Sequence, residues 1–343
     1  INARWLQLLF GFYPSHLYWR PILALVLLLV ALSPVLFSDR VSSKLLAFTA
    51  IYPFLMVWLL WGGSVWGPVS AALGFVVGFA IVKYGSTAMG ELAALIAAVF
   101  GAVVWWFLIA GEFSSALSSV VPIGIEAVES RQFGGFMLAI LLGVVAIGVS
   151  LPIGIVLALG RQSDLLIVKS LCVGFIEFIR GVPLITLLFV ANVVLAYFLP
   201  PGTNFDLILR VIIMITMFAS AYIAEVIRGG LAALPKGQYE AGDSLGLDYA
   251  QSMRLIIMPQ ALKISIPGIV NVAVGLFKDT TLVSVISMFD LVGMIRGPIL
   301  AATEWNGVYW ELWLFAILMF FPVCYGISQY SQWLERQLNT DHR

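Results

Sequence analysis

Long apolar runs dominate this sequence and limit what the chain can fold into. A helix needs about 20 mostly apolar residues to cross the roughly 30 Å hydrocarbon core of a bilayer. Such stretches lie near 21–37, 45–61, 66–82 and 92–110, and then near 134–160, 173–199, 207–227, 264–291 and 308–330. Because backbone groups in lipid must be satisfied within the protein, these stretches predict an all-α integral membrane protein.

The composition excludes several other classes of protein. Apolar residues make up 62% of the 343 residues and charged residues 10%, whereas soluble domains have about 45–50% and about 25%. The net charge of zero leaves no basic field for nucleic acid. Cys172 and Cys324 both sit in apolar runs, and the chain has only two histidines, so we expect neither a disulfide framework nor a metal site.

A more polar stretch from Gly111 to Arg131 divides the chain. We expect this stretch to be a loop, with extra transmembrane spans in residues 1–130 and a five-span core in residues 131–343. The stretch at 66–82 is only marginally long enough to cross. We therefore favour three N-terminal spans and eight in all, with nine left open.

The placement of Lys and Arg predicts the sidedness of the core. If residues 228–263 are cytoplasmic, the opposite face receives Arg131, Arg210 and Arg296. The cytoplasmic face then receives eight basic residues: Arg161, Lys169, Arg228, Lys236, Arg254, Lys263, Arg336 and Arg343. This excess follows the positive-inside rule and predicts a cytoplasmic C-terminus. Three N-terminal spans would place the N-terminus inside, in agreement with Arg4 and Arg20, and four would place it outside.

The segment 228–263 is the long polar interruption of the core. Residues 236–245 can form a short helix that Gly246 ends, because glycine readily adopts a left-handed conformation. A second helix can begin at Asp248 and end at Pro259, with apolar residues at helical spacing on one face. The segment is therefore either a helix–turn–helix on the cytoplasmic side or an amphipathic loop on the lipid surface.

The spacing within this segment resembles a known signature. Glu240-Ala241-Gly242, three residues, Gly246, nine residues and Ile256-Ile257-Met258-Pro259 are similar to the "EAA" motif of ABC importer permeases. That motif has alanine and leucine where this chain has Gly242 and Met258. Both substitutes are small or apolar like the originals.

Flanking motifs narrow the resemblance to the polar amino-acid uptake permeases of the histidine and glutamine type. The motifs are residues 221–230, 234–238, 176–184 and 277–283, and the resemblance covers about 131–343. The extra N-terminal spans and the tail at 333–336 resemble the general L-amino acid permease subgroup.

The resemblance implies a transport subunit of the bacterial inner membrane rather than an enzyme. ATP and Mg would be bound by two separate cytosolic ATPase subunits, and this chain itself has no phosphate-binding loop and no cofactor. A second permease chain, related but not identical, and a periplasmic amino-acid-binding protein would complete the importer. The segment 228–263 would be the coupling segment, and its first helix would be the coupling helix that contacts an ATPase subunit. In this helix Glu240 would be the polar anchor, Ala241 and Gly242 would permit close approach to the ATPase, and Gly246 would make the turn. Ile256 and Pro259 would hold the second helix against the spans.

Charged residues within the spans are the remaining candidates for function, because an ion at membrane depth is costly unless it is paired or used. Glu177 and Arg180 have a spacing that allows either a structural pair or a gating or substrate contact. Glu225 and Arg228 repeat this spacing, and there we favour a structural pair.

A second polar cluster interrupts the apolar run that follows the coupling segment. Lys278, Asp279, Thr280 and Thr281 offer a cation, an anion and two hydroxyls to a zwitterionic amino acid. Adjacent helical residues point about 100° apart, so both charges could face one cavity only if the helix is locally irregular. The alternative is that each charge pairs with another span or with the partner permease.

Two other functions remain as alternatives. An ion-gradient-driven secondary transporter would lack the coupling segment, and the halves of this chain show no duplicated pattern of broken spans. A membrane-embedded enzyme would need a convergent constellation of His, Cys or acidic residues in the spans, and we find none with workable spacing.

Overall fold

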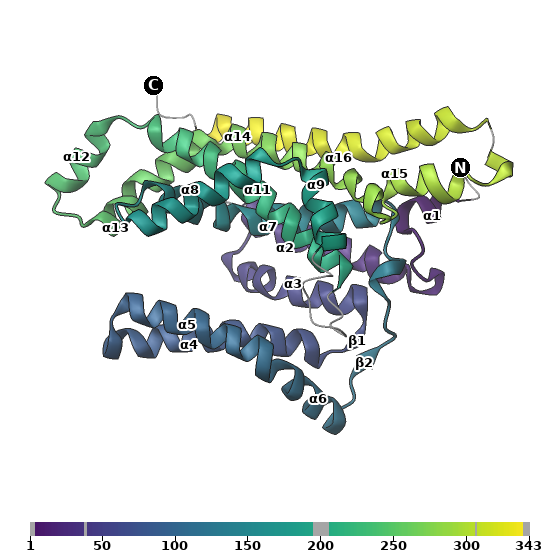
Figure 1. Ribbon diagram of the computed structural model, residues 1–343, viewed down its shortest axis with the longest axis horizontal. Helices are drawn as coiled ribbons and strands as arrows, with labels where there is room; N and C mark the ends of the chain where they lie inside the picture. The colour runs from purple at the N-terminus through teal and green to yellow at the C-terminus, as the bar shows by residue number, and fades with distance from the viewer. Residues whose placement is uncertain (1–3, 38–39, 195–205, 306, 339–343) are drawn as a thin grey trace. The chain divides into compact units, whose positions relative to one another are not determined.

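The computed structural model describes residues 4–37, 40–194, 206–305 and 307–338, which form two compact units (Figure 1). The N-terminal unit contains residues 13–132, and the core unit contains residues 1–12 together with 133–343. The end of the expected stretch 173–199 and the basic residue Arg343 lie outside the described residues.

The N-terminal unit has four helical segments that are long and apolar enough to cross a membrane. They are α2 (Trp19–Leu36), α3 (Leu46–Trp61), α4 (Trp66–Met89), and α5 (Glu91–Val104) continued by the π-helical turn Trp105–Ile109 and α6 (Ala110–Val120). A short antiparallel pair joins β1 (Gly63–Ser64) to β2 (Gly124–Ile125). The Trp105 and Trp106 indoles donate to carbonyl oxygens of Ser70 and Ala71, so the fourth segment is tied to α4.

The loop expected from Gly111 to Arg131 is wrong in its first half, because α6 continues to Val120. The serines that make this stretch polar bond within their own helix. Ser118 and Ser119 donate to carbonyl oxygens of the preceding turn at 2.7 Å. A hydroxyl satisfied in this way does not need to end a helix.

Contacts at the start of the core unit decide the number of N-terminal spans. The backbone of Gly11 pairs with that of Phe133, and Leu8 is buried in the same core as Phe136. The chain therefore leaves the core unit and returns to it at one level of the membrane, which requires an even number of crossings. The preference for three N-terminal spans is thus wrong, and the 24-residue helix α4 is the span whose length was underestimated.

The core unit is built from α-helices with several short irregular turns. Its elements are α1 (Trp5–Phe10), α7 (Gly135–Gln162), α8 (Leu166–Gly181), α9 (Leu184–Phe189) with the π-helical turn Val190–Val194, α11 (Leu207–Ala232), α12 (Lys236–Ser244), α13 (Tyr249–Ser252), α14 (Met258–Asp279) with the 3-10 turn Thr280–Ile286, α15 (Leu291–Met294) and α16 (Tyr309–Leu338). Residues 4–12, which the sequence grouped with the N-terminal spans, pack here because α1 lies against α7.

Small residues bring α7 and α11 into close contact. A Cβ atom on Gly154 would lie 2.6 Å from the Cγ2 atom of Ile223 and 3.2 Å from the carbonyl oxygen of Ser220. Ala158 and Ala224, which come next along α7 and α11, are fully buried in one hydrophobic core. Small residues allow helices to approach closely where lipid provides no hydrophobic drive between them.

α7 and α11 run in the same direction, since Gly154 lies beside Ile223 and Arg161 beside Glu225. The segment between them must therefore cross back. It does so as α8 and α9, which are bent by 101° at a break around Pro183. Arg210 at the start of α11 donates to carbonyl oxygens of Ala191 and Asn192, so the bent pair reaches the far end. The bent pair can thus serve as a fifth core span. The described residues hold eight helices long and apolar enough to cross a membrane, or nine with the bent pair, in agreement with the eight, possibly nine, expected from the sequence.

Substitution at Gly154 should reveal how tightly α7 and α11 pack. Gly154→Ala should destabilise the protein by about 1–3 kcal/mol, because the new methyl group has no room against Ile223. Gly148→Ala on the same helix should be neutral or slightly stabilising, since its Cβ would meet open space. Thermal unfolding of both variants in detergent tests this difference, and equal midpoints would contradict the close contact.

Candidate functional site

The first helix of the segment 228–263 ends as the sequence predicts. α12 covers Lys236–Ser244, and Gly246 adopts φ +71°. The Gly246 N–H donates to the Asp243 carbonyl oxygen at 2.9 Å, and the Leu247 N–H donates to the Gly242 carbonyl oxygen at 3.2 Å. These two bonds form a Schellman motif, which satisfies the last carbonyl groups of the helix.

The second helix begins at the predicted residue but does not end at the predicted one. The Asp248 side chain accepts from the Gln251 N–H, and the Gln251 side chain accepts from the Asp248 N–H, which completes a capping box. Pro259 was expected to end this helix, yet α14 continues through it. A π-helical turn over Met253–Ile257 precedes the proline. The wider turn gives the proline ring room, and its missing N–H lies in the first turn of α14, where it costs little.

The segment is braced within this chain. Gly242 is buried, and a Cβ at this position would meet the Ser252 hydroxyl, so α12 and α13 approach closely there. The Gln260 amide donates to the Gln238 side chain at 2.8 Å and joins α14 to α12. Sequence reasoning missed this amide pair, because nothing local connects two glutamines 22 residues apart.

The apolar side of the segment rests on the transmembrane helices. Met253 and Ile257 are buried, and they share one core with Ile176 of α8 and Leu231 of α11. Ile256, to which the resemblance gave this role, is half-buried and packs against the same core, whereas Pro259 is exposed. The segment is therefore not a loose loop, and Met253 and Ile257 hold it together with Ile256.

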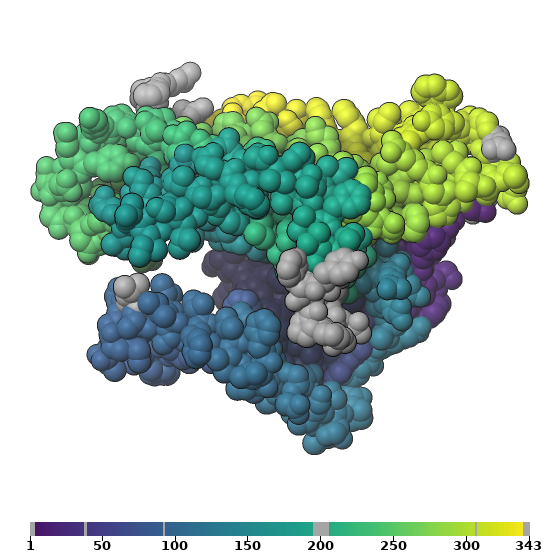
Figure 2. Space-filling model, viewed as in Figure 1, coloured from purple at the N-terminus to yellow at the C-terminus, as the bar shows by residue number. Residues whose placement is uncertain are grey.

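The opposite side of the segment is largely exposed in the part of the chain that the structure describes. Glu240 and Ala241 are exposed, and in the described residues the Glu240 carboxylate forms no ion pair or side-chain hydrogen bond. Leu245 and Tyr249 are 73% and 66% exposed. Figures 1 and 2 show α12 at one end of the helices of the core unit.

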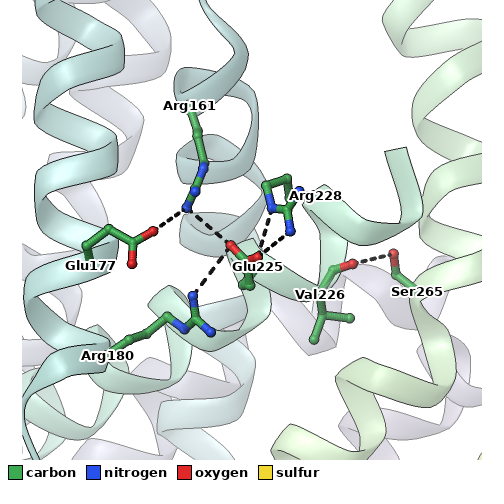
Figure 3. A network of polar contacts seen from close by, with 7 residues as sticks. All are labelled: Arg161, Glu177, Arg180, Glu225, Val226, Arg228 and Ser265. Atoms are coloured by element: carbon green, nitrogen blue, oxygen red, sulfur yellow. Dashed lines mark hydrogen bonds and ion pairs between the residues drawn. The ribbon is translucent and has the colours of Figure 1, made fainter. Parts of the chain in front are cut away.

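Next to this segment, five charged side chains form one network (Figure 3). The Glu225 carboxylate accepts from Arg228 at 2.8 and 2.5 Å and from Arg161 at 3.2 Å, and it lies 3.6 Å from Arg180. Arg161 also donates to Glu177 at 2.9 Å. One carboxylate therefore contacts arginines from three helices: α7, α8 and α11.

This network changes one of the expected pairs. The predicted pair of Glu225 and Arg228 is confirmed. Glu177 and Arg180 do not pair with each other, because Glu177 bonds Arg161 and Arg180 lies against Glu225 and over the ring of Tyr222. Ion pairs between helices replace the expected pair within α8. The spacing of residues along a single helix cannot predict such pairs.

The second polar cluster lies where α14 turns into a 3-10 helix at Thr280. This change supplies the local irregularity that a shared cavity would require. The Thr280 and Thr281 hydroxyls donate to the carbonyl oxygens of Phe277 and Lys278, so they can offer a ligand only acceptor capacity. Lys278 is exposed and Asp279 half-buried, and neither forms an ion pair with any residue that the structure describes.

Eight candidate spans, with a bent pair that can form a ninth, define a multi-span membrane protein. Residues 150–340 match the family described as "Binding-protein-dependent transport system inner membrane component". The chain belongs to this family of ABC importer permeases, and the ion-gradient alternative is not supported.

Two relatives extend the similarity to the whole chain. The chain is 57% identical to the glutamate/glutamine/aspartate/asparagine transport system permease protein BztC of Rhodobacter capsulatus, over 100% of this chain and 79% of that one. It is 38% identical to the inner membrane amino-acid ABC transporter permease protein YhdY of Escherichia coli, over 99% of this chain and 77% of that one. A solved amino acid ABC transporter with histidines is 30% identical with a TM-score of 0.53, and the match covers 59% of this chain and 92% of that one.

Proposed function

We propose that this permease subunit imports amino acids, driven by ATP that separate subunits hydrolyse. The observation that carries the proposal is the exposed face of α12, where Glu240 projects from a helix braced by Gly242 and Gln238. A rigid helix with an exposed polar anchor suits a groove on a partner protein. Two ATPase chains holding ATP and Mg, a second, non-identical permease and a periplasmic binding protein complete the proposed importer.

The names of the relatives support the substrate class. BztC is named for glutamate, glutamine, aspartate and asparagine, and YhdY for amino acids. We take acidic amino acids and their amides as the first substrates to test.

We propose that the coupling segment and the C-terminus face the cytoplasm. The excess of basic residues on that side supports this sidedness. The N-terminus then faces outward, because residues 8–11 pack beside the first turn of α7. The positive-inside rule would favour a cytoplasmic position for Arg20. However, Arg20 is buried and donates to the carbonyl oxygen of Glu126, so it does not contradict an outward N-terminus.

Cysteine labelling tests the sidedness. A cysteine at Gln238, on α12, should react only with impermeant reagents in the cytoplasm. A cysteine at the exposed residue Thr303 should react only from the opposite side, because one span separates the two. Labelling of both positions from one face would contradict this arrangement.

Changes in α12 should separate transport from ATP hydrolysis. Gly246→Val should be the harsher change, because an ordinary residue in a left-handed conformation costs about 1–2 kcal/mol. Glu240→Ala should lower uptake without reducing the amount of inserted protein. Uptake of labelled glutamate and ATP hydrolysis are measured together in proteoliposomes that contain the complete transporter.

Two matched variants control this experiment. Gly246→Asn should retain most of the transport, since asparagine tolerates the left-handed conformation. Asp164→Ala removes an exposed acid outside the coupling segment and should leave uptake unchanged. Normal uptake in both Glu240→Ala and Gly246→Val would refute the role of α12, and ATP-independent uptake would refute the proposed function.

We also propose that Lys278 and Asp279 contact the substrate. Both are ionic groups in a membrane helix without an ion partner in the described part of this chain, and such groups tend to be functional. A zwitterionic amino acid would complement both charges. A contact with the second permease is the alternative.

Charge removal distinguishes these two roles. Lys278→Met and Asp279→Asn nearly preserve size, and each should lower uptake and change the preference among acidic, neutral and basic amino acids. If the charges instead pair with the second permease, each variant leaves a buried ion unpaired at a cost of about 3–5 kcal/mol. Poor assembly with unchanged selectivity would then be observed, and the substrate role would be withdrawn.

A further inference from the structure

The bend between α8 and α9 interrupts the backbone hydrogen bonds of the broken span. α8 ends at Gly181, and α9 begins at Leu184 after Pro183. No capping hydrogen bond is formed by the Val182 N–H, and Pro183 has no N–H to donate. A side chain added at Gly181 would meet open space. The bend therefore lacks backbone hydrogen bonds at Val182 and Pro183, while its side chains pack on α11: Val182 shares a cluster with Ile179, Leu187 and Ala221.

Arg180 lies immediately before this bend and is fastened to α11. Its guanidinium group lies 3.6 Å from Glu225 and 5.5 Å from the ring centroid of Tyr222, two residues three apart on α11. A second link joins α8 to α11 through Arg161, which bonds both Glu177 and Glu225 (Figure 3). The end of α8 is thus held to Glu225 of α11 directly by Arg180, and indirectly by Glu177 through Arg161 of α7.

The same turns of α11 are fastened to the coupling segment. Gly230 contacts Ala261 and Ser265 of α14, and the Ser265 hydroxyl lies 3.4 Å from the Val226 carbonyl oxygen. α11 then continues to Ala232, four residues before α12 begins. A displacement of α12 and α14 must therefore move the part of α11 that carries Glu225.

We propose that Arg180 is a positioning residue that links the bend of the broken span to the coupling segment through Glu225. In this arrangement a displacement of α12 changes the angle between α8 and α9. The proposal rests on the proposed function in that an ATPase moves α12. Because the contact with Glu225 is a single long one rather than a bidentate pair, its strength depends on charge more than on the shape of the guanidinium group.

The test follows the bend directly in the complete transporter in proteoliposomes. Cys172 and Cys324 are replaced by alanine, and a single cysteine is placed at Gly181. Its labelling rate is measured without nucleotide and with ATP and vanadate. We expect the two rates to differ about five-fold or more in the parent, in the usual range of allosteric coupling. Arg180→Gln should reduce this difference to less than about two-fold and should lower the number of amino acids moved per ATP.

Two variants control the test. Arg180→Lys keeps the charge and should retain most of the difference in labelling rate. Lys169→Gln removes an exposed cation from the same helix and should change nothing, since in the described residues Lys169 forms no ion pair.

Several outcomes would overturn the proposal. If the labelling rate of the parent protein is the same without nucleotide and with ATP and vanadate, the bend does not move. An unchanged difference in Arg180→Gln, or an equal loss in Arg180→Lys and Arg180→Gln, shows that the charge does not act as proposed. Reduced assembly with a normal difference in the assembled fraction assigns Arg180 a structural role only. Each of these leaves ATP-driven uptake intact, whereas a parent without ATP-driven uptake refutes the proposed function itself.

Discussion

The close contact between α7 and α11 is the interaction on which the rest of the core unit depends. Lipid tails are as apolar as leucine side chains, so membrane helices associate through packing and polar contacts rather than through hydrophobic burial. Gly154 and Ala158 let α7 approach the Ser220–Ala224 stretch of α11 closely. Continued to the ends of the two helices, this approach brings Arg161 to 3.2 Å from Glu225. The charged network is thus a consequence of the packing that precedes it.

The network also shows how the Glu225 carboxylate can remain charged at its partly buried position. Glu225 is only 22% exposed, and an unpaired carboxylate there would lose much of its hydration. Three arginines compensate for it, and Glu177 offsets part of their excess positive charge. The five charges leave a net charge of +1, since three cations face two anions. Removing the shared carboxylate would leave three like charges close together.

Features encoded within a few residues could be predicted from the sequence. The turn at Gly246, the cap at Asp248 and the pair of Glu225 with Arg228 depend on local geometry, and each is present. Features that depend on distant contacts could not be predicted. Glu177 bonds Arg161, 16 residues away, and the Gly11–Phe133 pairing that sets the number of N-terminal spans joins residues 122 apart. Pro259 combines both kinds of feature. Proline normally ends a helix through its local geometry, but here the π-helical turn before Pro259 allows the helix to continue.

The distribution of backbone hydrogen bonds explains how such a unit can transmit motion. The turn inside the coupling segment is closed on both sides, since a Schellman motif follows α12 and a capping box precedes α13, and an unbroken helix then leads into the membrane. It also shares one buried core with Ile176 of α8. At the bend the Val182 N–H has no such bond, although the Val182 side chain packs with Ile179 and Leu187. When a force acts on two connected parts, the stiffer part moves as a rigid body and the more flexible part changes shape. In the proposed importer, the bonded turn of the coupling segment and the bend without a bond at Val182 would therefore have complementary roles.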